Sequence, residues 1–431
     1  MKLFEFPERK DWSSICQRPY RSNEEVKVQV KSLVDQVKKD NDRALYELTK
    51  QIDGIKLSSL WVDVREVLKK SDIDPELKEA LQLAKSSISR FHKEQLIVEP
   101  PVETMPGVTC WRKSVPIERI GIYVPGGSAT LFSSLLMLAI PAQIARVNQI
   151  IVCSPPNQSG FIDPVLAYAA NLLGIHRIYT IGGAQAIAAM AYGTETIPRV
   201  DKIVGPGNQY VTVAKQIVQA DSVAIDMPAG PSELLVIADQ SAPPHFVAAD
   251  LLSQAEHGED SQVVLVSDHH ETIKQVLRKL DLQLADIPRK KIAAKSLEHS
   301  RAVLCNDLAE AIQFSNAYAP EHLILAVSNY SELMKQIKNA GSVFLGYYSC
   351  ESAGDYASGT NHTLPTGGWA RSYSGVSVDT FIKKITFQEI SPQGLSKIGS
   401  TVEHLAEAEN LFAHKNAITI RLSKLGGENE Y

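Results

Sequence analysis

The sequence lacks the features that mark several large classes of protein. No apolar run in its 431 residues approaches the ~20 residues that a membrane helix needs, and residues 1–10 lack the apolar core of a signal peptide. Its 44 basic and 49 acidic residues give a formal net charge of -5, which offers no electrostatic footprint for nucleic acid. We therefore expect a cytoplasmic protein with neither a membrane nor a nucleic-acid partner.

Cysteine is scarce and scattered. The five cysteines are odd in number and far apart in the chain: Cys16, Cys110, Cys153, Cys305 and Cys350. Because no two of them are separated by two residues, neither a disulfide framework nor a thiolate metal site is indicated. Cys153 ends an apolar run, which favours an inert buried thiol, whereas Cys350 lies nearer a polar loop and is a minor candidate for a covalent aldehyde adduct.

The dinucleotide-binding fingerprint G-x-G-x-x-G is also missing. The nearest segment, 205–210, begins Gly-Pro-Gly but lacks the third glycine. Spacing alone therefore does not predict a nicotinamide cofactor.

Hydrophobic periodicity changes along the chain. Within the first hundred residues, apolar side chains recur at helical spacing over 26–37 and 77–91. From residue 120, short apolar runs, most of them closed by a Gly or Pro turn, alternate with helical stretches, and after residue 375 the chain reads as helical again. The predicted strands are 120–124, 150–153, 177–181, 203–204, 223–226, 234–238, 263–266, 323–327 and 343–346. This alternation predicts an α/β protein with two parallel-sheet domains, N-terminal helices and a helical C-terminal tail.

Polar residues gather near the ends of the predicted strands. Ligands of parallel sheets bind beyond the carboxyl ends of the strands. Tyr123, Gln185, Asn208 and Ser232 each lie at or just past such an end. We expect these four side chains to converge on one crevice.

Four further residues suggest a metal site only in combination. Gln254 and His257 are three apart on a predicted helix and project from one face, although such a pair alone is typical of a solvated surface. Asp355 also fits a turn of its own, and His414 fits a histidine at a helix end. Together, two imidazoles, one carboxylate and one amide oxygen suit a borderline divalent ion such as zinc. The adjacent Glu256 points about 100° away on the helix and is interpreted as structural.

Glu321 and His322 stand together before the apolar run 323–327, where the entrance of a strand would expose both to a cleft. His322 suits accepting an alcohol proton near neutral pH, and Glu321 suits activating a water molecule. An ordinary exposed strand start fits the spacing as well. Two rival classes also fit: a zinc-dependent hydrolase with Glu321 as water base, and a non-catalytic two-domain protein that binds a small molecule.

Over nearly its whole length the chain resembles the histidinol dehydrogenase family. The likeness is carried by the segments 123–128, 182–188, 204–208, 226–233, 251–258, 320–323 and 352–362. It implies a zinc- and NAD-dependent enzyme of histidine biosynthesis that oxidises L-histidinol to L-histidine with two NAD⁺, through an aldehyde that stays bound. The segment 367–371 is less typical, but it matches no catalytic position of the family.

The resemblance also implies roles for individual residues. The ligands of one zinc ion per subunit would be Gln254, His257, Asp355 and His414. The proton-handling pair would be Glu321 and His322. The NAD contacts would be Tyr123, Gln185 and Asn208. Substrate contacts would be the metal ligands, the proton-handling pair, Ser232, His362 and Glu409.

The family's architecture implies a homodimer in which Glu409 and His414 reach into the partner's site. Its NAD-binding domain is an incomplete Rossmann-like unit, which accounts for the missing fingerprint. On this basis we expect an N-terminal arm, a discontinuous domain with the catalytic and metal residues, an NAD-binding domain and a C-terminal tail. Their expected ranges are, in that order, 1–21, 22–121 with 232–377, 122–231, and 378–431.

Overall fold

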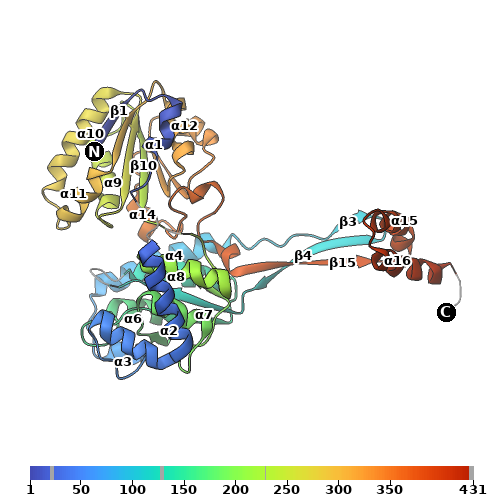
Figure 1. The fold of residues 1–431 in the computed structure, drawn as a ribbon. Coiled ribbons are helices and arrows are strands. Elements are labelled where there is room, and N and C mark those ends of the chain that lie inside the picture. Colours follow the sequence, from blue (N-terminus) through green and yellow to red (C-terminus); the bar gives the residue numbers. More distant parts are fainter. Residues whose placement is uncertain (20–23, 127–130, 229, 427–431) are drawn as a thin grey trace. The chain divides into compact units, whose positions relative to one another are not determined.

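The computed structural model describes residues 1–19, 24–126, 131–228 and 230–426. Gly127, Ser128 and Ala229 of the family-like segments lie outside these ranges. The chain forms two units, Met1–Gln95 with Ile117–Phe381, and Leu96–Pro116 with Ile382–Tyr431. The expected α/β class with parallel sheets and a helical tail is confirmed (Figure 1).

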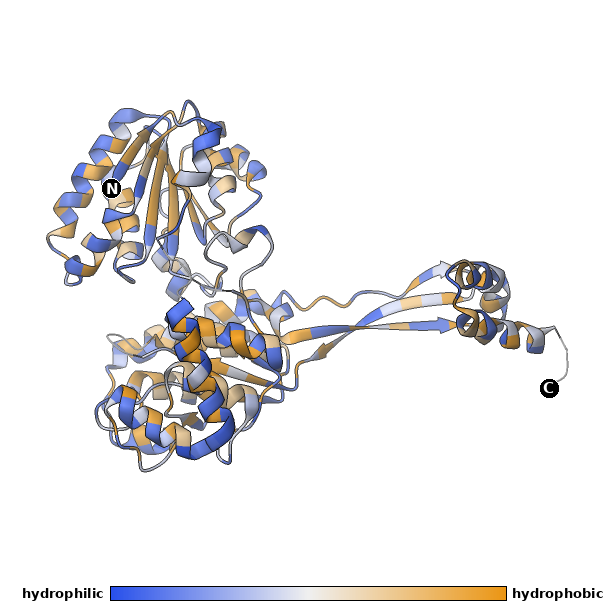
Figure 2. Ribbon diagram, in the orientation of Figure 1, coloured by the Kyte–Doolittle hydropathy of each residue, from blue (hydrophilic) through white to orange (hydrophobic). Residues whose placement is uncertain are grey.

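The first unit contains two six-stranded sheets, and one of them is parallel throughout. We call it the β10 sheet. Its order is β1 (Lys2–Glu5), β12 (Arg301–Leu304), β11 (Gln262–Ser267), β10 (Glu233–Ala238), β13 (His322–Ala326) and β14 (Ser342–Leu345). Its strands β10, β11 and β13 are buried along their whole length because helices cover both faces of the sheet, and Figure 2 shows the hydrophobic colour along the central strands.

Successive side chains of β10 pack on opposite faces of this sheet. Leu234 and Val236 pack with helices α9, α10 and α11, and Leu235 and Ile237 pack with α1 and α12 (Figure 1). The bounds of these helices are α1 Trp12–Ile15, α9 Pro244–Ala255, α10 His270–Leu284, α11 Lys290–Glu298 and α12 Leu308–Tyr318. The short helices α13 (Tyr330–Leu333) and α14 (Glu351–Tyr356) flank β14 in the chain.

The second sheet, here the β5 sheet, repeats this arrangement. Its order is β2 (Trp61–Asp63), β7 (Arg177–Tyr179), β6 (Gln149–Cys153), β5 (Arg119–Tyr123), β8 (Lys202–Val204) and β9 (Ala224–Ile225). Only β2 pairs antiparallel among these strands. The accompanying helices are α2 (Glu24–Leu48), α3 (Val64–Lys69), α4 (Pro75–Lys93), α5 (Phe132–Ile144), α6 (Pro164–Leu172), α7 (Gly183–Tyr192) and α8 (Gln209–Asp221).

We expected residues 22–121 to form one domain with residues 232–377. This grouping is wrong for the α-helices within 22–121 and for β2 and β5, which belong with the β5 sheet. Helix α2 packs against α7 and α8, and β2 and β5 are strands of the β5 sheet. An apolar stripe on a helix indicates that one face is buried, but not which sheet buries it. The partner of α2 was therefore not readable from its periodicity.

The second unit is a three-stranded antiparallel sheet followed by two helices. The strands β3 (Val102–Met105), β4 (Val108–Pro116) and β15 (Ile382–Ile390) pair in the order β15, β4, β3. Helices α15 (Pro392–Ala408) and α16 (Phe412–Leu425) pack against each other. None of these three strands was expected from the sequence.

Among helices in the described ranges, none combines the length and apolar character required to traverse a lipid bilayer.

Candidate functional site

A cavity of about 670 Å³ in the first unit is lined by residues of both sheets. From the β5 sheet, Pro125 follows β5 and the segment 205–208 follows β8. From the β10 sheet, Ser232 precedes β10, and Glu321 and His322 stand at the start of β13. The cavity therefore meets the carboxyl ends of one sheet and the amino ends of the other.

Asn208 and Ser232 line the cavity as expected, but Tyr123 and Gln185 are not among its lining residues. Asn208 caps α8, where its side chain accepts the N–H groups of Tyr210 and Val211 at 3.1 and 3.2 Å. Tyr123 is buried and its hydroxyl accepts the N–H of Gly183 at 3.0 Å.

Burial raises the pKa of Tyr123 to about 12, so the hydroxyl is neutral at physiological pH. Gln185 is 1% exposed, and its Nε2 has no hydrogen-bond partner within the described ranges. An unpaired buried amide is costly to the fold. Gln185 is therefore an expected cofactor residue whose buried amide donor is unsatisfied.

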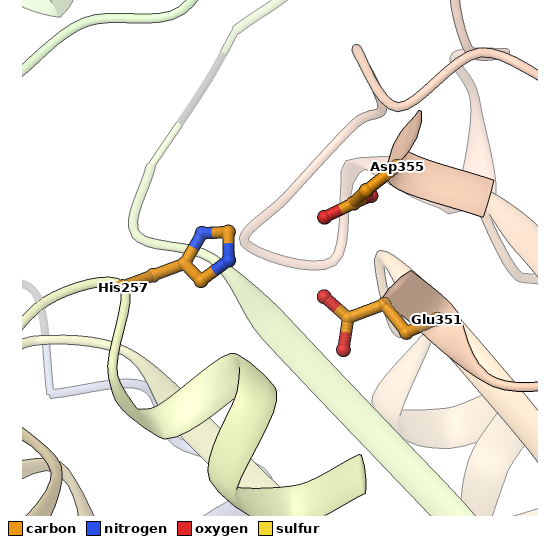
Figure 3. Close-up of side chains that lie close together, drawn as sticks. All are labelled: His257, Glu351 and Asp355. Carbon is orange, nitrogen blue, oxygen red and sulfur yellow. The ribbon is translucent and has the colours of Figure 1, made fainter. Parts of the chain in front are cut away.

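Three groups that can bind a cation converge beside the cavity. A ring nitrogen of His257 and carboxylate oxygens of Glu351 and Asp355 all lie within 4.8 Å of one another (Figure 3). Glu351 and Asp355 are four apart on α14, so both side chains leave one face of that helix. His257 follows α9, the helix that carries Gln254.

Glu351 also orients Gln254, which is fully buried. When the amide is assigned from its hydrogen bonds, its nitrogen donates to the two carboxylate oxygens of Glu351 at 2.5 and 3.2 Å. The amide oxygen is then left free of that contact. Glu351 was missed in the sequence, although its spacing of four residues from Asp355 on a helix was a usable signal.

The ionisation of this group suits a cation. Burial raises the pKa of Asp355 to about 7, and burial together with Asp355 and Glu321 raises that of Glu351 well above its usual range. Burial, and then the charge of Arg289, lower the pKa of His257, so its imidazole is neutral and able to coordinate. Packed carboxyls with raised pKa values are stabilised as carboxylates by a divalent cation.

Glu321 and His322 are buried, at 6% and 4% exposure, so they do not form the ordinary exposed strand start that the spacing also allowed. Both still line the cavity. Glu321 Oε2 accepts the N–H of Glu233 at 2.8 Å, and His322 Nδ1 lies 3.1 Å from the carbonyl oxygen of Glu233. His322 Nε2 lies 3.8 Å from Asp355 Oδ1, which puts the pair beside the candidate metal ligands.

Burial dominates the ionisation of both side chains. It lowers the pKa of His322 to about 3, so the ring is neutral at physiological pH. It raises the pKa of Glu321 well above the usual range, against the opposing effect of the Glu233 N–H. A carboxyl with a raised pKa suits proton exchange with water.

His362 bridges two parts of the cavity wall. Its Nδ1 lies 3.1 Å from the carbonyl oxygen of Asp355, and its Nε2 lies 3.3 Å from Ser134 Oγ on α5. Burial lowers the pKa of His362 to about 4. A neutral ring in this position can make hydrogen bonds to a substrate without adding charge.

Glu409 and His414 belong to the second unit. Glu409 follows the last residue of α15, His414 lies in the first turn of α16, and both side chains are exposed. Their roles as substrate contact and metal ligand remain predictions.

Two sheets covered by helices, with a cavity at their strand ends that is lined in part by ionisable side chains, are typical of an α/β enzyme that binds a small molecule. A family model described as histidinol dehydrogenase matches residues 16–422. The histidinol dehydrogenase of Bacteroides thetaiotaomicron is 53% identical over 426 residues, which cover 99% of this chain and 100% of that protein. That of Haemophilus influenzae is 50% identical over 413 residues, with 95% and 96% covered.

A crystal structure of histidinol dehydrogenase from Elizabethkingia anophelis superposes with a TM-score of 0.96 at 52% identity, and the match covers 99% of both chains. The chain therefore belongs to the histidinol dehydrogenase family, whose members are oxidoreductases of histidine biosynthesis. The resemblance seen in the sequence is confirmed.

Proposed function

We propose that this cavity oxidises L-histidinol to L-histidine in two NAD-dependent steps, with the aldehyde held between them. The observation that carries the proposal is the meeting of Glu321 and His322 with His257, Glu351 and Asp355 at one cavity. Two proton-handling groups beside a cation site are what an alcohol oxidation followed by hydration and oxidation of an aldehyde needs.

In this proposal His322 takes the proton of the substrate hydroxyl while the first hydride leaves for NAD⁺. Its place in the cavity wall, with Nε2 free of hydrogen-bond partners among the described residues, supports that role. Glu321, in its carboxylate form, then takes a proton from the water that adds to the aldehyde, and the resulting hydrate anion gives its hydride to a second NAD⁺ and becomes the carboxylic acid. His362 and Ser232, which line the cavity, contact the substrate.

The donor set fits one zinc ion per subunit. Gln254, His257 and Asp355 would hold it, with His414 as the fourth ligand, and Glu351 would keep the Gln254 amide in place. When bound, zinc supplies a fixed positive charge that orients the polar groups of the substrate. The mixture of nitrogen and oxygen donors without a thiolate supports this choice of ion.

NAD would bind at the carboxyl edge of the β5 sheet. Asn208 and the segment 205–208 line the cavity there, beside the central strands β5 and β8 where the strand order reverses. Such reversal points are the usual nucleotide sites of α/β sheets. Gln185, with its free buried donor, and Tyr123 would complete the cofactor contacts.

Product stoichiometry tests the reaction itself. Each histidinol should give two NADH, and little aldehyde should be captured by a carbonyl reagent in the medium. A yield near one NADH with quantitative capture of aldehyde would contradict a bound intermediate. Absence of NADH would leave the zinc hydrolase as an alternative, and absence of any turnover would leave the small-molecule binding protein.

We further propose a cytoplasmic homodimer in which Glu409 and His414 complete the partner's site. Mixing inactive Asp355→Ala and His414→Ala protomers should then restore activity, because each mixed dimer contains one intact site. With random exchange about half the dimers are mixed, so recovery should approach roughly a quarter of wild type. No recovery after verified subunit exchange would show that His414 serves its own chain.

A further inference from the structure

Glu233, the first residue of β10, carries a charge that the proposed mechanism does not use. Glu233 is 1% exposed and begins a strand whose other residues are all apolar. We propose that Glu233, held by Arg18, is a positioning residue that orients both Glu321 and His322. The proposal rests on the function proposed above and assigns a further residue to that site.

The peptide groups of Glu233 contact both members of the pair. Its N–H donates to Glu321 Oε2 at 2.8 Å, and its carbonyl oxygen lies 3.1 Å from His322 Nδ1. Strands β10 and β13 are parallel neighbours, with Leu234 opposite His322, so these peptide groups stand at the start of the pairing. Any shift of the backbone at Glu233 moves the contacts of both side chains at once.

The carbonyl contact also selects the tautomer of His322. A carbonyl oxygen only accepts, so Nδ1 must carry the ring proton, and the lone pair of the neutral ring then lies on Nε2. Nε2 is buried without a hydrogen-bond partner in the part of the chain that the structure describes. The ring of His322 lines the cavity, so this contact keeps its basic nitrogen unprotonated and available.

The side chain of Glu233 is fixed by a two-pronged ion pair. Arg18 Nε and Nη2 donate to its two carboxylate oxygens at 2.9 and 3.0 Å. Arg18 is itself held by the carbonyl oxygen of Tyr318 at 2.7 Å, and its guanidinium carbon lies 3.8 Å from the centre of that ring. A planar guanidinium with this many contacts has little freedom, so it holds the carboxylate in one place.

A second anchor comes from the segment 367–371, which matched no catalytic position of the family. The N–H of Gly367 donates to Glu233 Oε1 at 2.8 Å. Arg371 donates to the carbonyl oxygen of Gly368 within the segment and to that of Ala317, and the second contact ties the segment to α12. Glu233 thus joins three distant parts of the chain behind the proton-handling pair.

Charge-removing variants test the proposal. Arg18→Met or Glu233→Gln alone removes the charge of one partner and leaves the other without its ion pair, which destabilises the fold whatever the pair does for catalysis. The double variant Arg18→Met with Glu233→Gln has no unpaired charge and should regain stability. If the pair positions Glu321 and His322, kcat of the double variant should still fall about 10- to 100-fold, while KM for NAD stays within about twofold.

The tautomer gives a readout that a purely structural role would not move. With histidine labelled by ¹⁵N, the His322 signals are assigned by their loss in His322→Asn. Wild type should show protonated Nδ1 and unprotonated Nε2, and the double variant a mixture. Arg18→Lys keeps the charge but loses the two-pronged contact, so its His322 tautomer and kcat can be compared with wild type in the same way, and a smaller fall in kcat is expected. This variant serves as the test if the double variant does not fold.

Arg119→Met with Asp201→Asn is the matched control. That exposed pair joins the starts of β5 and β8 at 3.2 Å, away from the carboxyl ends that line the cavity, so its loss should leave kcat unchanged. If folded double or Arg18→Lys variants keep wild-type kcat and one tautomer, the positioning role is overturned. If wild type makes no NADH from histidinol, the proposed function fails, yet the tautomer comparison still decides whether Glu233 orients His322.

Discussion

The β5 sheet and the β10 sheet have the same strand order, but they face the cavity with opposite ends of their strands. The orders are β2-β7-β6-β5-β8-β9 and β1-β12-β11-β10-β13-β14. In both sheets a strand from earlier in the chain lies at one edge, and the first strand of the parallel series pairs with the fourth at the centre. The cavity meets the carboxyl ends of β5 and β8 but the amino ends of β10 and β13. A shared topology therefore does not decide which end of a parallel sheet carries a site.

The two edges also differ in chemistry. The β5 sheet presents short turns rich in glycine and proline, such as 205–208, whose peptide groups can approach a phosphate closely. The β10 sheet presents His257, Glu321 and His322, whose pKa values are all shifted by burial. The contrast predicts that cofactor binding and proton transfer can be damaged separately.

The largest expected effect is metal removal. Chelation should reduce histidinol oxidation to background and added zinc should restore it, because the candidate ligands His257 and Asp355 lie at the same cavity as Glu321 and His322. If the residues at the carboxyl ends of the β5 sheet bind NAD without help from the metal, calorimetry should show that NAD still binds the metal-free protein. Full turnover by protein that contains less than about a tenth of a metal ion per subunit would show that the reaction does not need zinc.

Next in size is the loss of the proton acceptor. His322→Asn should lower kcat for alcohol oxidation by about 10² to 10⁴, with the dissociation constant of NAD unchanged. Glu321→Gln should slow oxidation of added aldehyde more than oxidation of histidinol, since only the aldehyde step needs an activated water. Equal losses in both half-reactions of Glu321→Gln would contradict the division of roles.

A smaller effect is expected from the β5 edge. Gly205 has φ +125, and a Cβ there would lie 2.2 Å from the carbonyl oxygen of Tyr123. Gly205→Ala should raise KM for NAD about tenfold or more, since strain of about 1–3 kcal/mol would shift the turn. Gly174→Ala is the control, with φ +69 but no heavy atom within 4 Å. A similar KM for both variants would show that the 205–208 turn does not contact the cofactor.

The smallest effect is expected from the cysteines. Burial raises the pKa of Cys153 strongly, so the thiol is protonated and a poor nucleophile. Cys153→Ala and Cys350→Ala should each retain at least about half of wild-type kcat. An inactive but folded and metal-loaded variant would instead indicate a covalent aldehyde adduct.

The sequence predicted most strands of both sheets as short apolar runs between turns, but it missed β1 and β12 of the β10 sheet. It did not predict β15, because residues 382–390 are exposed or half-buried and carry no core pattern. Nor did it predict β2, a three-residue antiparallel edge strand whose register depends on β7. Such strands are fixed by their neighbours rather than by their own residues.

At the site, residue types and spacing singled out Glu321, His322, His257 and Asp355, which the structure brings together at one cavity. Glu351 and Glu233 were not singled out, and neither lines the cavity. Glu351 orients the Gln254 amide, and Glu233 contacts Glu321 and His322 through its peptide groups. A backbone contact leaves no trace in residue type, although a lone acidic residue heading an apolar strand was a signal that could have been followed.

The N-terminal strand has a consequence for the order in which the protein is completed on the ribosome. The strands of the β5 sheet end at residue 225, whereas β1 pairs with residues 301–304 and must wait for them. Closing so long a loop is slow. An unpaired strand can meanwhile pair with another chain and aggregate, but β1 is short and has the exposed, charged residues Lys2 and Glu5 at its ends, which oppose such pairing. Arg18 follows on the same stretch of chain, so we expect the acid–base pair to be aligned only in one of the last folding events.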